Sequence, residues 1–138
     1  MVSPFKATEA EQVQQYFKLK KKVKAGAKFI VTQVGFDARK FHELLQYIKQ
    51  QGWDIPVIGN IYVLPLGTAK LMNKNKIPGC VVPDKLLEQL EKEAQAPDKG
   101  RGARIDRAAK MYAFMKGMGY DGVHIGGHGI SYEDVEYI

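Results

Sequence analysis

Gln33 is the residue whose type and position best suit chemistry at a ligand. It follows an apolar run that starts at Phe29, and Thr32 directly precedes it. In parallel α/β sheets, side chains at the C-terminal end of a strand face the ligand. A primary amide offers two donors and an acceptor to the edge of a heterocycle. We therefore expect Gln33 to bind a ligand, and the alternative is a strand-end glutamine that is only solvated.

Tyr62 and His124 are the other candidate substrate-binding residues. Tyr62 lies where a second strand would end, and it has the same parity as Asn60, so the two share one face. They either line a pocket or simply pack. His124 is either a pocket-lining residue or a hydrogen-bonded core residue. It has no Cys, Asp or Glu at ligand spacing, so we predict no metal site.

No catalytic residue is assigned from the sequence. It has no Walker motif, no G-x-S-x-G and no Cys–His pair that would indicate nucleophilic catalysis. Lys22 belongs to a run of lysines at positions 18, 20, 21, 22 and 24, which is either a solvated helix face or an anion-binding surface. The single cysteine, Cys80, lies in an apolar context and is expected to be buried and inert.

The composition fits one domain that spans residues 1–138. The chain has 45% apolar residues, enough to bury a core, and its net charge of +6 permits anionic partners without proving any. One cysteine excludes an intrachain disulfide. No apolar run reaches the roughly 18 residues that span a bilayer, and the N-terminus has no signal-peptide core. We therefore expect a cytoplasmic protein without membrane contact.

The elements that must position these side chains alternate between helix and strand. Apolar runs predict strands at residues 29–36, 56–64 and 122–127, and residues 79–82 are either a strand or a loop. Capping signals and apolar spacing predict helices at residues 8–24, 38–51, 68–75, 83–96 and 103–118, and another that begins after residue 131. This alternation predicts an α/β fold with a parallel sheet and right-handed crossovers.

The first predicted helix has the clearest local signals. Thr8 and Glu11 form a T-x-x-E capping box at its start. Gly26 is expected to end the helix in a left-handed conformation. The residues on its predicted apolar side are Val13, Phe17 and Val23.

Four segments resemble the C-terminal half of methylenetetrahydrofolate reductase, a flavin-dependent (β/α)8 barrel. They are LKKKVKAGAKFIVTQVGFD, DIPVIGNI, KIPGCVVPDKLLEQL and GYDGVHI, and the likeness covers nearly the whole chain. The resemblance implies a partial TIM barrel. In the intact family enzyme, reduced FAD passes a hydride to methylene-folate in one-carbon metabolism. The resemblance also implies that Gln33 contacts the pterin and the flavin edge and that Lys22 contacts the flavin phosphate. Asp37 fits the motif too, but we expect it to cap a helix.

The chain departs from the family pattern in two places. GNIYVLP stands where the family has Pro-Gly-Ile-x-Pro. GVHIGGHG lacks the aromatic and polar residues that follow the family's histidine. These changes affect folate recognition more than the fold, and they fit a paralogue with an altered substrate.

The length predicts a half barrel, because a complete barrel of this type needs about 250 residues. We expect a fragment or a paralogue that is inactive alone. A missing N-terminal half or a second copy in a homo-oligomer would complete it, because a half barrel exposes sheet edges and an apolar face. The alternative function is a basic-faced binding or oligomerising module without catalysis. Nucleic acid is an unfavoured partner, because the lysine run is expected to lack interleaved exposed aromatic residues.

Overall fold

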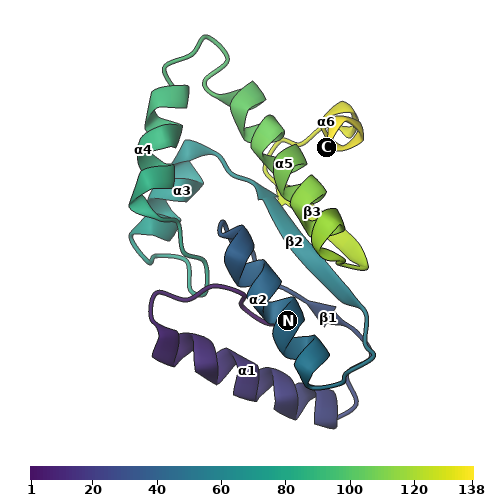
Figure 1. Cartoon of the computed structure of the whole chain (residues 1–138). Helices are drawn as coiled ribbons and strands as arrows, with labels where there is room; N and C mark the ends of the chain where they lie inside the picture. Colours follow the sequence, from purple (N-terminus) through teal and green to yellow (C-terminus); the bar gives the residue numbers. More distant parts are fainter.

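A three-stranded parallel sheet forms the centre of the computed structural model, which describes residues 1–138 (Figure 1). The strands, in spatial order, are β1 (Ile30–Val31), β2 (Val57–Val63) and β3 (Gly122–Gly127). Both pairs are parallel, with Ile30 opposite Val57 in the first. An isolated parallel bridge between Val2 and Thr32 extends the sheet by one position beyond β1. The predicted α/β class with a parallel sheet is therefore confirmed.

Six helices flank the sheet, and the caps predicted from the sequence are confirmed. The helices are α1 (Glu9–Lys24), α2 (Ala38–Gln50), α3 (Leu66–Asn73), α4 (Asp84–Glu93), α5 (Arg101–Met118) and α6 (Tyr132–Tyr137). Thr8 and Glu11 form the capping box of α1, Asp37 caps α2, and Ser131 caps α6. Gly26, with a φ of +96°, follows the end of α1. None of the helices combines the length and the hydropathy that a membrane-spanning segment needs.

β1 is much shorter than the strand predicted for residues 29–36. The N–H of Asn60 donates to Oγ1 of Thr32 at 2.9 Å, so a side chain replaces the backbone carbonyl that would continue the ladder. The N–H of Gln33 donates to the carbonyl of Val2 at 2.6 Å. Pairing with β2 therefore stops at the threonine. The predicted length of this strand was wrong, because a run of β-branched residues does not show which acceptor each backbone N–H will bond to.

α1 packs through a different side from the one that its apolar residues predicted. Val13 and Phe17 are 46% and 62% exposed, whereas Gln12 and Leu19 are 1% and 3% exposed. Nε2 of Gln12 donates to the carbonyl of Ser3 at 3.3 Å, whereas its buried Oε1 has no hydrogen-bond partner in the chain. The prediction for Val13 and Phe17 was therefore wrong.

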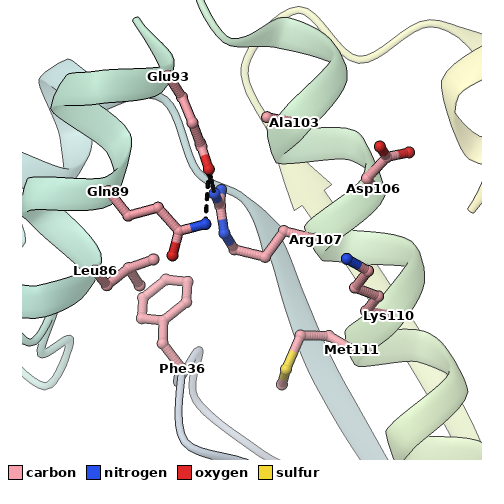
Figure 2. Close-up of a pocket in the computed structure, with 9 residues that line it drawn as sticks. All are labelled: Phe36, Leu86, Gln89, Glu93, Ala103, Asp106, Arg107, Lys110 and Met111. Carbon is pink, nitrogen blue, oxygen red and sulfur yellow. Dashed lines mark hydrogen bonds and ion pairs between the residues drawn. The ribbon is translucent and has the colours of Figure 1, made fainter.

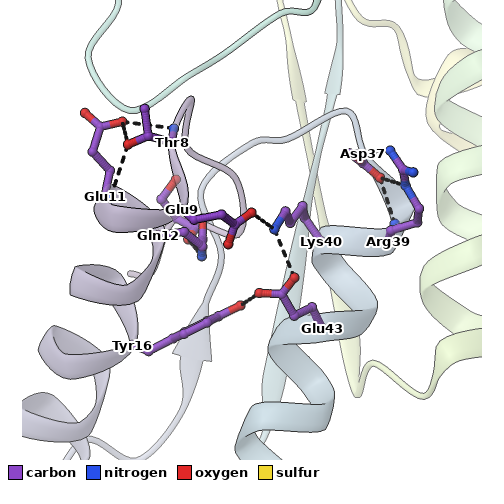
Figure 3. A network of polar contacts seen from close by, with 10 residues as sticks. Thr8, Glu9, Glu11, Gln12, Tyr16, Asp37, Arg39, Lys40 and Glu43 are labelled. Carbon is purple, nitrogen blue, oxygen red and sulfur yellow. Dashed lines mark hydrogen bonds and ion pairs between the residues drawn. The ribbon is translucent and has the colours of Figure 1, made fainter.

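A polar network holds α1 against α2 (Figure 3). Tyr16 stacks on Tyr47 with ring centroids 4.5 Å apart, and its hydroxyl donates to Glu43. Lys40 donates to Glu43 at 3.0 Å and to Glu9 at 2.8 Å. Burial alone would raise the pKa of the Glu43 carboxyl, but the hydrogen bonds from Tyr16 and Lys40 outweigh it and lower that pKa. The network therefore keeps Glu43 ionised and ties the two helices together.

The two faces of the sheet differ in their cover. The odd-numbered residues of β2 lie under α2 and α5, and α5 approaches so closely that a Cβ on Gly59 would overlap Sδ of Met115. The even-numbered residues point to the opposite face, where Ile58 and Tyr62 are only half-buried. A second cluster of seven buried residues lies with α3, α4 and the loop at residues 79–82. The sheet therefore has one tightly packed face and one partly open face, and of the two the partly open face has room for a ligand.

Candidate ligand-binding site

Polar side chains of two neighbouring strands meet on the partly open face. Asn60 and His124 are register partners, and Nδ1 of His124 lies 3.3 Å from Oδ1 of Asn60. Because that amide oxygen is an acceptor, Nδ1 carries the proton in this contact, and Nε2 of a neutral ring is left as an acceptor. Asn60 is 8% exposed, whereas the His124 side chain is exposed. His124 is therefore hydrogen-bonded but is not a core residue.

An open cavity of about 460 Å³ lies where the three strands end. Gln33 reaches it from the segment after β1, Tyr62 from the end of β2, and His128 from the loop after β3. The carboxyl ends of parallel strands share one edge of a sheet, which brings these three side chains together. His124 does not line this cavity. The other lining residues are Val34, Thr68, Leu71, Met72, Ile77, Pro78 and Cys80.

Gln33 has an unused donor beside this cavity. Its Oε1 accepts a hydrogen bond from the N–H of Val34 at 3.1 Å, and its Nε2 makes no hydrogen bond within the chain. Nε2 lies 3.8 Å from the point that a Cβ on Gly79 would occupy. Gly79 has no side chain, so only its backbone lies beside this amide. A free amide donor that faces open space suits an acceptor on a ligand.

Sequence reasoning did not identify His128, which lines the cavity, or Lys6, which lies near Gly79 but is not a lining residue. Nζ of Lys6 lies 3.7 Å from the same point in front of Gly79. Lys6 comes near Gly79 because Val2 pairs beside β1, so no local motif marks its position. His128 follows a strand, as Gln33 does, and that position was the signal available for it.

Cys80 belongs to the apolar wall of the cavity. It is 5% exposed, which confirms the predicted burial. Burial raises the pKa of its thiol, and the positive charge of Lys6 partly opposes this effect. Because the thiolate is the reactive form of cysteine, the raised pKa makes Cys80 a poor nucleophile.

Lys22 lies on the exposed side of α1 and does not line the cavity. Its Nζ donates to the carbonyl of Met1 at 2.7 Å. Its contact with a flavin phosphate stays a prediction. Asp37 acts as the cap of α2, because its Oδ1 accepts from the N–H of Arg39 at 2.9 Å. Hydrogen bonding from the Arg39 side chain also lowers the pKa of the Asp37 carboxyl.

Two exposed aromatic residues lie on either side of the lysine run in the chain, and none lies within it. Phe17 is 62% and Phe29 is 59% exposed, and Lys18 and Lys28 are their exposed neighbours in the chain. Phe17 stays in solvent because α1 packs through another side, and Phe29 precedes the first paired residue of β1. The weak case for nucleic acid therefore stays a prediction, although Phe17 lies next to the run.

A second cavity, of about 420 Å³, lies between α4 and α5 (Figure 2). Arg107 of α5 points across it and forms an ion pair with Glu93 of α4. Phe36, Leu86 and Met111 supply apolar lining. Because the ion pair joins two helices, we assign it a structural role. No group of three or more His, Cys, Asp or Glu side chains is placed to hold a metal ion anywhere in the chain.

Comparison with known proteins supplies the family. The family model described as methylenetetrahydrofolate reductase matches residues 2–127. The chain belongs to the methylenetetrahydrofolate reductase family. The matched range includes all three strands, so Gln33, Tyr62 and His124 lie inside the family domain.

A solved structure supports the fold of this family member. An uncharacterised protein from Clostridium thermocellum, which binds two copies of 5-methyl-5,6,7,8-tetrahydrofolic acid, matches with a TM-score of 0.60 and 14% sequence identity. The match covers 93% of this chain and 46% of that chain, so this chain spans about half the length of that protein. At this identity the likeness establishes the fold alone. A comparison with curated proteins gives no significant match.

Proposed function

We propose that this chain supplies the C-terminal half of a (β/α)8 barrel that binds a folate. In the completed barrel, it would take part in a flavin-dependent reduction of one-carbon metabolism. The observation that carries the proposal is the cavity at the strand ends, where Gln33 keeps a free amide donor. Family membership supports the reaction class, and the folate-binding structural relative supports the ligand class.

A pterin ring suits this cavity for simple physical reasons. The ring is flat, with apolar faces and with donors and acceptors on its edges. Met72, Ile77 and Pro78 offer apolar contacts to the faces, and the Gln33 amide and the Tyr62 hydroxyl offer hydrogen bonds to the edges. The volume of about 460 Å³ lies within the range of roughly 300–1,000 Å³ that is usual for small-molecule sites.

The residues present fit part of a flavin. The free Nε2 of Gln33 suits a carbonyl on the edge of the isoalloxazine ring. Lys22 would contact a flavin phosphate only if the nucleotide extended along the N-terminal segment, because it lies outside the cavity. A bound reduced flavin supplies the hydride. The part of this chain is to orient the folate ring through Gln33 and Tyr62 and to keep water from one side of it.

Strands outside the described residues would complete the site. A (β/α)8 barrel has eight parallel strands, and this sheet has three strands plus the bridge at Val2. The partly open face with Asn60, Tyr62 and His124 would then face the barrel interior. We propose that a second copy of the chain or a separate N-terminal half closes the barrel, and that the chain alone does not catalyse the reduction.

Binding of 5-methyltetrahydrofolate to the purified chain tests the proposal, by calorimetric titration. We expect saturable binding that Gln33→Ala weakens by about 2- to 10-fold, the effect of one lost hydrogen bond. Gln14→Ala is the matched control, because Gln14 is exposed on α1 and lies outside the cavity. This control should keep the wild-type affinity.

Light scattering on the same samples separates the two ways of closing the barrel. A dimer that binds the folate supports closure by a second copy, and a monomer that binds it argues for a separate half. A dimer of the chain that shows no detectable binding at millimolar folate would refute the proposed ligand class. Reduction of methylene-folate by the chain alone, with FAD and a nicotinamide donor, would contradict the predicted inactivity.

A further inference from the structure

The excess positive charge of the chain is concentrated in one stretch. Residues 12–36 contain six lysines and no acidic residue, and the net charge of the whole chain is +6. The remainder of the chain is therefore neutral overall. The only acidic residues of α1, Glu9 and Glu11, lie in its first turn, where they bond to Lys40 and to Thr8. The lysine-rich part of α1 therefore has no carboxylate of its own to neutralise it.

One outward face of α1 combines this charge with exposed apolar side chains. Val13 and Phe17 are 46% and 62% exposed, and three lysines that follow them on the helix are exposed too. With 3.6 residues per turn, all five side chains fall within about 100° of one another around the helix. We call this the lysine face, and its residues are Val13, Phe17, Lys20, Lys21 and Lys24.

The lysine face has no partner within the chain. None of its three lysines takes part in an ion pair. α1 packs onto the rest of the protein through Gln12 and Leu19, which helical spacing places on the other side of the helix. Figure 1 shows α1 at the edge of the molecule, with α2 beside it. Exposed apolar side chains beside charge that nothing neutralises are typical of a surface that binds a partner.

Charge complementarity selects an anionic lipid surface as that partner. A second copy of the chain would bring the same positive face and would be repelled. Nucleic acid fits less well, because the face has no arginine and offers a single aromatic ring for stacking. A lipid surface supplies both an anionic layer for the lysines and an apolar layer for Val13 and Phe17. No helix of the chain can span a bilayer, but binding to the surface of a bilayer does not require one.

We propose that the lysine face binds the surface of an anionic lipid bilayer. Phe17 and Val13 enter the boundary between headgroups and acyl chains, and the lysines contact the lipid phosphates. Long lysine side chains suit this arrangement, because their stems cover apolar surface while the ammonium groups reach the headgroups. The assignment revises the expectation that the chain has no membrane contact. It goes beyond the proposed function and is independent of it, because no residue of the lysine face lines the cavity at the strand ends.

Sedimentation of the purified chain with lipid vesicles tests the proposal. We expect binding to vesicles of equal parts phosphatidylcholine and phosphatidylglycerol that weakens as salt is added, and no binding to phosphatidylcholine alone. Each lysine near an anionic surface contributes about 5-fold to the affinity, so replacing Lys20, Lys21 and Lys24 together by glutamine should weaken binding by about 100-fold. Phe17→Ser should weaken it by about 10-fold, because the apolar contact is lost.

The matched control removes the same charge from another surface. Lys85, Lys92 and Lys110 are exposed on α4 and α5 and take part in no ion pair. Replacing these three together by glutamine should keep most of the affinity. Phe17→Trp reports insertion directly, because its emission should shift to the blue on anionic vesicles when compared with the wild type.

Four results would overturn the assignment. They are no binding to anionic vesicles at low salt, an equal loss in the control triple variant, an unchanged affinity of Phe17→Ser, and tighter binding of the wild type to single-stranded oligouridylate than to vesicles. The second result would mean that only net charge matters, and the last would mean that the partner is a nucleic acid. Circular dichroism checks the fold of each variant, and each substituted side chain is exposed. Titration with 5-methyltetrahydrofolate tests the proposed function separately, because the vesicle variants should keep their folate affinity.

Discussion

Replacing Gly59 by alanine should destabilise the strand that carries Asn60 and Tyr62. A Cβ at Gly59 would overlap Sδ of Met115, and it would lie 3.1 Å from Cε of Met115 and 3.3 Å from Cδ1 of Tyr120. Met115 is 0% exposed, so its side chain has no solvent to move into. The added methyl group must therefore displace α5 from β2 or force Met115 into a strained rotamer.

The expected loss of stability follows from two opposing effects. Overpacking a core costs about 1–3 kcal/mol. Alanine also restricts the unfolded chain more than glycine does, which offsets about 0.4–1 kcal/mol. We therefore expect Gly59→Ala to lower the free energy of unfolding by about 1–2 kcal/mol. With a urea slope of about 1–3 kcal/mol per molar, the midpoint of unfolding should fall by roughly 0.3–2 M.

Urea unfolding followed by circular dichroism measures this effect, and Gly117→Ala is the matched control. Gly117 lies in α5, two residues from Met115, and a Cβ there would have no heavy atom within 4 Å. An alanine is favoured over glycine in a helix by up to about 1 kcal/mol, so the control should be as stable as the wild type or more so.

A double-mutant cycle with Met115→Ala shows whether the overlap with the methionine is the cause. Met115→Ala alone should cost about 2–5 kcal/mol, because it leaves a cavity in the core. In that background Gly59→Ala has space, so its cost should largely disappear and the coupling energy should be about 1–2 kcal/mol. An equal cost of Gly59→Ala in both backgrounds, or no cost in either, would refute the reasoning.

Two further predictions concern the helix caps. Asp37→Asn keeps a capping side chain but removes its charge. Hydrogen bonding from Arg39 lowers the pKa of the Asp37 carboxyl in the folded protein. The ionised carboxylate therefore stabilises the fold at a pH above the pKa of an unfolded aspartate. This stabilisation is lost as the pH falls through the lowered pKa of the folded state. Urea unfolding should therefore show a larger advantage of the wild type over Asp37→Asn at neutral pH than in acid, and an advantage that does not shrink in acid would contradict this sign. Thr8→Ala should cost about 1 kcal/mol through loss of the α1 cap, whereas Thr8→Ser should keep most of the stability, and equal loss in both variants would argue against a capping role.

The helix starts were predictable because a cap is a local interaction. The capping box needs only Thr8 and Glu11 at the right spacing, and the cap of α2 needs only Asp37 before a helical run. The common cavity of Gln33 and Tyr62 was also within reach of sequence reasoning, because the carboxyl ends of parallel strands meet at one edge.

The errors lie where a residue's environment depends on a distant partner. The strand predicted for residues 29–36 ends early because the hydroxyl of Thr32 takes the N–H of Asn60. Phe17 is exposed because α1 uses Gln12 and Leu19 to pack. Neither outcome is visible in composition or spacing, since each depends on the choice between competing partners after the chain has folded.

The sequence by itself determined the α/β class, most helix boundaries, β2 and β3, and the position of Gln33 at a strand end. These features depend on caps and on apolar runs within a few residues of one another. Only the tertiary structure decided that Lys6 and Gln33 both approach Gly79, because a parallel bridge between Val2 and Thr32 brings together residues far apart in the chain. Backbone pairing of this kind uses N–H and C=O groups, and every residue except proline has both. The side chains of the N-terminal segment therefore do not predict it.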